Sequence, residues 1–515
     1  MWESNRITAS DWISKYFPES RSAKIKRYLK NIGWVLALTF LGVSTAILLD
    51  MGKNTTIKRQ IDDYTFGVFS IFWRNVLPVD PVVTFTLFGI DRDTIEGWEQ
   101  NSRHIPRERL RDLVRIAVEG GARAVVLDVA LDGDDRGNGQ LYDYLKSLQD
   151  PAGTPVFLIH NPYLDEPVQK GSAGGCRMVR NTMFGNLDAE SPQIHWATTN
   201  VSGNSRFLTA RYLTQYERIC TAMEPRITPS LFLAMNALIG PDGKPPEPSP
   251  AAALAELNSK LAEAVGRNPP ADSYCSDDPS KTITLGNGRQ IVLDQSPCRT
   301  ENWIRFTLPW ILEPGEQAAS YRSGNAPVID RQIVHGGMLR AKPLPKLYQN
   351  RIVVIGAVHQ DSGDVRITPF GWMPGTMIII NAIHSQINLP DLKPIGKTGV
   401  FIIELGISLM ASIGAVFLHS LQRRAGIIDV TIIMICCVLV PGVAVYIWGA
   451  GLWIDVSAPA IAAFLHHKLL HAVLHRFRGH GGGDGGGHIK DPPPPDMEPI
   501  AVPRPDKAKI STTQS

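Results

Sequence analysis

The sequence predicts an α/β fold: a mostly parallel sheet flanked by helices in an exported domain, plus four transmembrane α-helices, one N-terminal and three C-terminal. Two observations predict this class. Between residues 81 and 161, nearly unbroken apolar strands alternate with segments of helical spacing, which is typical of a parallel sheet covered by helices. At both ends of the chain, apolar stretches reach the about 20 residues that a membrane helix needs.

The N-terminal apolar stretch, residues 31–49, carries no charged side chain. Basic residues are concentrated just before it, between positions 21 and 30, so the positive-inside rule keeps that end of the chain in the cytoplasm. A cleaved signal peptide is the competing interpretation. The long polar lead-in and the lack of an A-x-A step before Asp50 favour an uncleaved anchor.

The C-terminal apolar part contains two strong candidate spans, residues 400–422 and 430–454, and a weaker third, residues 456–474. Basic residues follow the first and the last of these, so four spans bring both termini to the cytoplasmic side. The expected organisation is a cytoplasmic segment at 1–30, transmembrane helices at 31–50, 399–422, 427–449 and 452–474, an exported domain at 51–398, and a disordered cytoplasmic tail at 475–515.

Charge and cysteine content narrow the function. The chain has 52 Lys and Arg against 49 Asp and Glu, and the resulting +3 is too small to indicate a nucleic-acid partner. Four cysteines lie in the expected exported domain, an even number in a compartment that permits disulfides. Three pairings are possible. We favour the sequence neighbours, Cys176 with Cys220 and Cys275 with Cys298.

The exported domain divides into an α/β core and a less regular middle. The expected core strands lie at 81–91, 122–131, 154–161 and 351–358, and the expected helices at 106–121, 139–149 and 378–387. Residues 162–330 hold the four cysteines, a Pro- and Ala-rich stretch, and a hairpin at 281–294 with an Asn-Gly turn. We interpret this middle part as an elaboration inserted into the core.

Three stretches occur in order between the predicted membrane segments: VVTFTLFGIDRDTI, IPRERLRDLVRIAVEGGARAVVLDVAL and RIVVIGAVHQDSGDVRITPFGWMPGTMIIINAI. Together they resemble the CHASE2 domain, the extracytoplasmic sensor module of bacterial transmembrane signalling proteins, over about residues 62–395. The resemblance implies a receptor in the bacterial inner membrane. Family members usually carry a cytoplasmic cyclase or kinase after the last helix. Here only the tail follows, without the H-R-D or D-F-G motif of a kinase.

Four aspartates lie at the ends of expected strands: Asp91 ends the first, Asp128 lies near the end of the second, and Asp361 and Asp364 follow the late strand. Because the carboxyl ends of parallel strands converge where such folds bind ligands, these carboxylates are suited to a cation or a basic ligand. The alternative is that they cap helices and fill solvated loops. Arg107 is either part of this site or a structural partner of the carboxylates. With Thr368, from the Thr-Pro step of the family-like segment, the candidate ligand-binding residues are Asp91, Arg107, Asp128, Asp361, Asp364 and Thr368.

These observations predict a membrane-anchored sensor, not an enzyme. We expect it to bind an unknown extracytoplasmic ligand or partner and to signal to a separate cytoplasmic protein. A homodimer would let paired helices carry the signal. No catalytic residue, metal or cofactor is expected, because the exported domain has no G-x-S-x-G or H-E-x-x-H motif. The alternative is a structural or interaction subunit of a cell-envelope complex with no small-molecule ligand.

Overall fold

The computed structural model describes part of the chain, mostly within residues 81–394. The described residues are 81–98, 105–131, 137–160, 177–179, 182–204, 209–220, 225–240, 242–266, 282–293, 303–308, 310, 321–323, 326–334, 339, 344–359, 362–389, 392–394, 399 and 452–453. The predicted transmembrane helices therefore lie outside the described residues, apart from positions at their edges. Within the described residues, no helix has both the length and the apolar composition that a membrane crossing requires.

The helices of this part of the chain are α4 (Arg92–Trp98), α5 (Arg107–Glu119), α6 (Asn138–Lys146), α7 (Leu187–Glu190), α8 (Leu231–Leu238), α9 (Pro250–Gly266) and α11 (Gly375–Ile387). The strands are β1 (Thr84–Ile90), β2 (Ala124–Asp128), β3 (Val156–His160), β4 (Arg177–Met178), β5 (Ile194–Thr198), β6 (Val201–Asn204), β7 (Thr209–Leu213), β8 (Tyr216–Cys220), β9 (Pro225–Pro229), β10 (Thr282–Thr284), β11 (Gln290–Val292), β12 (Tyr321–Ser323), β13 (Ala326–Ile333), β14 (Arg351–Ala357), β15 (Val365–Thr368), β16 (Gly371–Pro374), β17 (Lys393–Pro394) and β18 (Leu452–Trp453).

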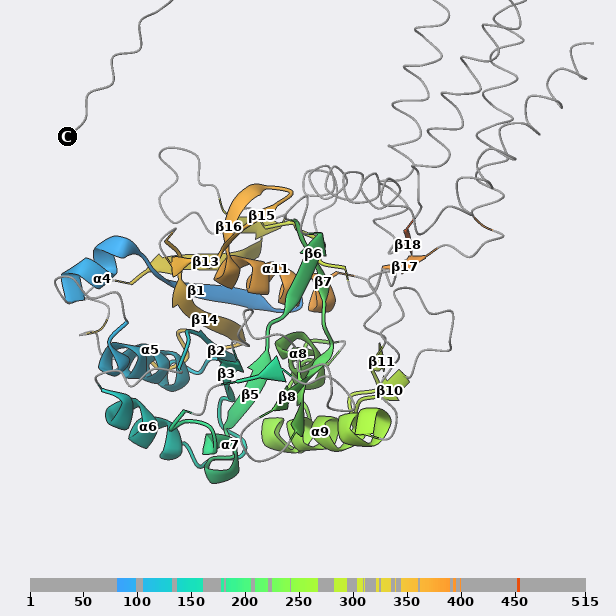
Figure 1. Cartoon of the computed structure of the whole chain (residues 1–515), viewed down its shortest axis with the longest axis horizontal. Helices are drawn as coiled ribbons and strands as arrows, with labels where there is room; N and C mark the ends of the chain where they lie inside the picture. The colour runs from blue at the N-terminus through green and yellow to red at the C-terminus, as the bar shows by residue number, and fades with distance from the viewer. Residues whose placement is uncertain are drawn as a thin grey trace, which may run out of the picture. The chain divides into compact units, whose positions relative to one another are not determined.

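The central sheet has the strand order β12-β13-β1-β14-β2-β3-β5 (Figure 1). Six of these strands run parallel, and β12 is antiparallel to β13 at one edge. The strands β1, β2, β3 and β14 are apolar and buried along nearly their whole length, as expected for a sheet that is covered on both faces. The predicted α/β class with a mostly parallel sheet is confirmed.

Helices cover the two faces of this sheet (Figure 1). On one face α5 and α6 pack Leu113 and Leu141 against Phe88 and Leu127 in one apolar core. On the other face α8, α9 and α11 contribute to a second core. Every residue of α8 is buried, and nearly every residue of α11, so both helices lie inside the molecule rather than on its surface.

Part of the segment 162–330 belongs to the α/β core, whereas we expected an elaboration inserted into it. Its strand β5 extends the central sheet beside β3, and its helix α8 lies in the apolar core on one face. The strand β13, which begins inside this segment, pairs directly with β1. Its other described elements are the short helix α7, the long helix α9, the small sheet β4-β8-β9, the strands β6 and β7, which form a sheet with the later β15 and β16, the edge strand β12, and the predicted hairpin β10-β11.

The strand order brings the carboxyl ends of β1, β14 and β2 together at one edge of the sheet. The chain passes from β1 through α5 to β2 and leaves a place between them that β14 fills much later in the sequence. In the resulting register Gly89 of β1 lies beside Gly356 of β14, and Gly356 lies beside Asp128 of β2. The carboxyl ends of three neighbouring strands therefore meet at one edge, which is where parallel α/β sheets bind ligands.

Candidate functional site

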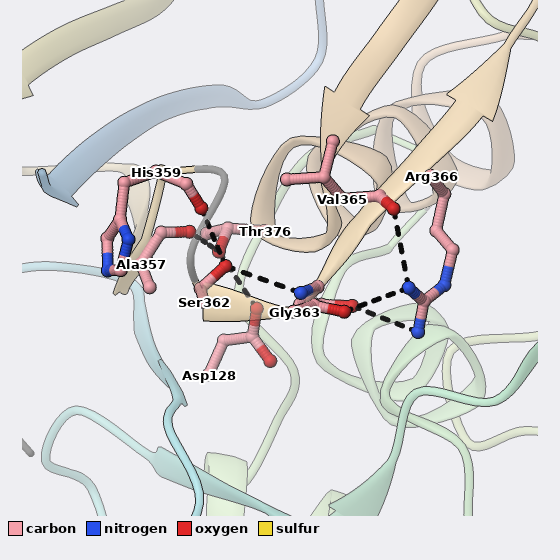
Figure 2. A network of polar contacts seen from close by, with 9 residues as sticks. Asp128, Ala357, His359, Ser362, Gly363, Val365, Arg366 and Thr376 are labelled. Atoms are coloured by element: carbon pink, nitrogen blue, oxygen red, sulfur yellow. Dashed lines mark hydrogen bonds and ion pairs between the residues drawn. The ribbon is translucent and has the colours of Figure 1, made fainter. Parts of the chain in front are cut away.

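Asp128 ends strand β2 at this edge, and the first turn of α11 lies against it (Figure 2). The hydroxyl of Thr376 donates a hydrogen bond to Oδ2 of Asp128 over 2.9 Å. The neighbouring Gly356 makes this approach possible, because a Cβ there would lie 2.6 Å from Oγ1 of Thr376 and 3.2 Å from Cβ of Asp128. A side chain at position 356 would thus separate the helix from the carboxylate.

Asp364 comes from the loop that leads into β15, and its carboxylate lies over the start of α11. A Cβ on Gly375 would overlap that carboxylate, so the first residue of the helix must be glycine for Asp364 to lie there. The backbone N–H of Gly375 donates to the carbonyl of Asp364 over 2.7 Å. Ser362 accepts a weaker bond from the Asp364 N–H at 3.3 Å, and the guanidinium of Arg366 lies 3.7 Å from Oδ1.

The two carboxylates form an acidic pair with perturbed titration. Burial and, to a lesser extent, the charge of Asp364 raise the pKa of Asp128 from 3.8 to about 7, against the opposing effect of the Thr376 hydrogen bond. Burial also raises the pKa of Asp364, against the attraction of Arg366. The Asp364 side chain is half exposed, so solvent reaches the pair from its side. The geometry therefore favours a proton or a cation at this edge.

Arg107 contacts the loop that follows Asp128 and β2. It is the first residue of α5 and is 3% exposed. Its Nη2 donates to the carbonyl of Ala130 over 2.8 Å, two residues beyond Asp128. The structure therefore shows Arg107 holding the loop that follows β2.

Two candidate residues have local structural roles instead. Asp91 caps α4, because its Oδ1 accepts from the Thr94 N–H at 2.8 Å and lies 2.6 Å from the Thr94 hydroxyl. Thr368 closes the turn between β15 and β16, where its hydroxyl donates to the Gly371 carbonyl over 2.9 Å. The capping alternative thus describes Asp91. Asp361 lies outside the described residues.

Sequence reasoning did not single out Thr376, Gly356 or Gly375. The signal for Thr376 and Gly375 was present, because a Gly-Thr step directly after Pro374 begins the helix that follows the aspartate loop. The loop also holds His359, whose carbonyl accepts from the Ser362 hydroxyl at 2.8 Å (Figure 2). The Nδ1 atom of His359 is buried and has no hydrogen-bond partner within the described part of the chain.

The other cavity and the titratable clusters of the described residues are less suited to binding a ligand. A cavity of about 30 Å³ lies beside β9 and is lined by the ion-paired Asp188 and Arg226 together with His195 and Thr228. This volume suits about two water molecules and is too small for most ligands. Burial lowers the pKa of His195 to about 4, so its ring is neutral at neutral pH. No cluster of three or more His, Cys, Asp or Glu side chains in the described ranges could hold a metal ion.

The cysteines are only partly described. Cys220 is the last residue of β8 and is disulfide-bonded. Cys176, Cys275 and Cys298 lie outside the described residues, so the pairing of the four stays a prediction.

Comparison with known protein families identifies the family of the chain. The CHASE2 domain family matches residues 38–417, which is most of the chain. The chain therefore belongs to the CHASE2 domain family, a family of sensory domains, as its sequence motifs predicted. Searches of curated proteins and of solved structures found no match.

Proposed function

We propose that the chain is a membrane-anchored extracytoplasmic sensor subunit whose input is the acidic pair Asp128 and Asp364. One observation carries the proposal: in a member of a sensory-domain family, two carboxylates with raised pKa values lie where the ends of the central strands meet a buried helix. On this proposal the chain signals to a separate cytoplasmic protein and catalyses no reaction itself.

The chemistry of the pair supports a basic or cationic ligand, or the proton itself. Two carboxylates close together in a partly dry site repel each other, and this repulsion is relieved by any positive charge that arrives. The described residues offer no third carboxylate or imidazole for a tightly held metal. An ammonium or guanidinium group, on a small molecule or on a partner protein, needs only the oxygen acceptors that the pair provides.

The membrane part of the proposal comes from the sequence. Four apolar segments would anchor the chain in a bacterial inner membrane with both termini in the cytoplasm and the sensor domain outside. The short parallel pair of β17 and β18 supports this arrangement, because it joins the residues before the second predicted span to Leu452 and Trp453, the first two residues of the fourth predicted span. In the proposed topology both of these segments lie at the outer side of the membrane. We also propose that the exported cysteines pair as sequence neighbours and that two copies associate.

The experiment is a crosslinking pull-down of the full-length protein from its native membrane, with wild type compared with Asp128→Asn/Asp364→Asn. Recovery of a cyclase, kinase or other cytoplasmic regulator, in an amount that changes in the double variant, supports a sensor with its output in a second chain. Recovery of envelope-assembly proteins alone, or of no protein, overturns the proposal and favours the structural subunit. Turnover of a small molecule that Asp361→Ala abolishes would point to an enzyme instead.

A further inference from the structure

The buried helix α11 contacts the acidic pair at one end and the entry to β1 at the other. Its 13 residues span about 20 Å at 1.5 Å per residue. Apart from its apolar packing, it is held by polar side chains that bond to segments far away in sequence. Such a helix cannot shift at one end without changing defined hydrogen bonds at the other.

At the first turn, the Thr376 hydroxyl has one proton and two acceptors within reach. Oδ2 of Asp128 lies at 2.9 Å and the carbonyl of Ala357 at 3.2 Å. A charged carboxylate is the stronger acceptor and takes the proton. When Asp128 is neutralised, this preference weakens, and the hydroxyl can turn to Ala357. The charge of Asp128 thus decides which strand, β2 or β14, holds the start of α11.

Directly after the last turn, the C-cap residue Asn388 binds the backbone of Val83 as a neighbouring strand would. Its Oδ1 accepts from the Val83 N–H and its Nδ2 donates to the Val83 carbonyl, both over 2.9 Å. Both residues are buried. The Nδ2 atom also lies 2.7 Å from Nδ1 of His384. Burial lowers the pKa of His384 to about 3, so its neutral ring accepts this bond and fixes the orientation of the amide.

The Asn388–Val83 contact lies where the domain joins the segments that lead to the first and second predicted membrane helices. Val83 begins the described core on the side of the first predicted membrane helix, residues 31–50, and Asn388 precedes the second, residues 399–422. We propose that α11 and the Asn388–Val83 contact transmit the charge state of Asp128 to the two segments that join the sensor domain to these membrane helices. This inference rests on the proposed function and names the path by which its signal leaves the domain.

The same helix provides a matched control. Asn381, within α11, is a buried amide like Asn388 at the helix end, and its Oδ1 accepts from the N–H groups of Thr307 and Leu308 at 3.1 and 2.9 Å. Its chemistry is that of Asn388, but its target lies in the interior segment around residue 308. Asn381→Ala therefore removes a buried amide from the helix and leaves the bonds to Val83 in place.

The test is hydrogen–deuterium exchange of the full-length protein in lipid nanodiscs at one pH. Asp128→Asn is the probe, because it imitates the neutral carboxyl. It is introduced into wild type, Asn388→Ala and Asn381→Ala. We expect the probe to change exchange about threefold or more in peptides covering 362–376 and 82–90. The change at 82–90 should disappear in Asn388→Ala and persist in Asn381→Ala.

Each other result overturns the inference. A change at 82–90 that survives Asn388→Ala, or that Asn381→Ala removes equally, shows that the contact does not carry the signal. A change confined to 362–376 is consistent with the acidic pair as an input but shows that its charge is not transmitted through α11 to Val83. No change in either segment removes the acidic pair as an input, and the proposed function with it. If Asn388→Ala fails to fold, Asn388→Asp replaces it, because this variant keeps the side-chain size and loses the donor to the Val83 carbonyl.

Discussion

The sharpest prediction concerns Asp128→Asn, which removes a charge from a buried position. The pKa of Asp128 is raised from 3.8 to about 7 in the folded protein. Each pKa unit corresponds to about 1.4 kcal/mol, so the ionised form destabilises the folded state by up to about 4 kcal/mol. Between pH 4 and pH 7 the folded protein binds a proton that the unfolded chain has lost, so wild-type stability falls as pH rises through this window and is lowest above it.

Asparagine keeps the acceptor for Thr376 and cannot ionise. At pH 8 we therefore expect the variant to unfold several degrees above wild type, and at pH 5 we expect the difference to shrink, because wild-type Asp128 is then protonated. Thermal unfolding of the full-length protein, followed by tryptophan fluorescence between pH 5 and 8, measures this. Asp242→Asn is the control: the hydrogen bond from Lys244 lowers the pKa of Asp242, so that substitution should not stabilise the protein at pH 8. Parallel pH profiles for wild type and Asp128→Asn would refute the reasoning.

Three further predictions are independent of that profile. Asp91→Ala should lower stability by about 1 kcal/mol through loss of the α4 cap, and denaturant titration measures this; an unaltered stability would contradict the capping role. Gly375→Ala should expel the carboxylate of Asp364 from its place over α11 and weaken the dependence of the melting temperature on pH; an unaltered profile would contradict the site geometry. Non-reducing peptide mapping should recover Cys176 linked to Cys220, and a link from Cys220 to another cysteine would refute the neighbour pairing.

The sequence was sufficient for the elements of the core but not for their neighbours in space. Apolar runs in the sequence predicted β1, β2, β3 and β14, because parallel strands that are buried on both faces are apolar along their whole length. The insertion of β14 between β1 and β2 could not be derived, since that place is filled by a strand more than 200 residues later. The helix α8, apolar except for Asn236, was missed as well, because its complete burial leaves no polar face to mark a helical period.

For the candidate site, too, the sequence predicted individual residues but not their neighbours in space. Asp91 and Asp128 both end a strand, and the sequence placed both in one candidate site. Three residues after Asp91 comes Thr94, a local signal for a cap that could have separated the two aspartates. The partner of Asp128 is Thr376, 248 residues away, and a distance of that order leaves no trace in local spacing. Asp364 was placed correctly beside the late strand, but its position over α11 depends on Gly375, which a sequence pattern does not distinguish from a turn glycine.

The measurement that tests the central claim most directly is an isotope-edited infrared titration of the aspartate carboxyls in the full-length protein. The proposed input is a pair of carboxylates whose ionisation is opposed by burial and, at Asp128, by the charge of Asp364. We expect one protonated carboxyl band to appear with a midpoint near pH 7 and to be absent from Asp128→Asn. If every aspartate carboxyl titrates below about pH 5, as unperturbed side chains do, ionisation of Asp128 is not opposed, and the repulsion that an arriving proton or cation is proposed to relieve does not exist.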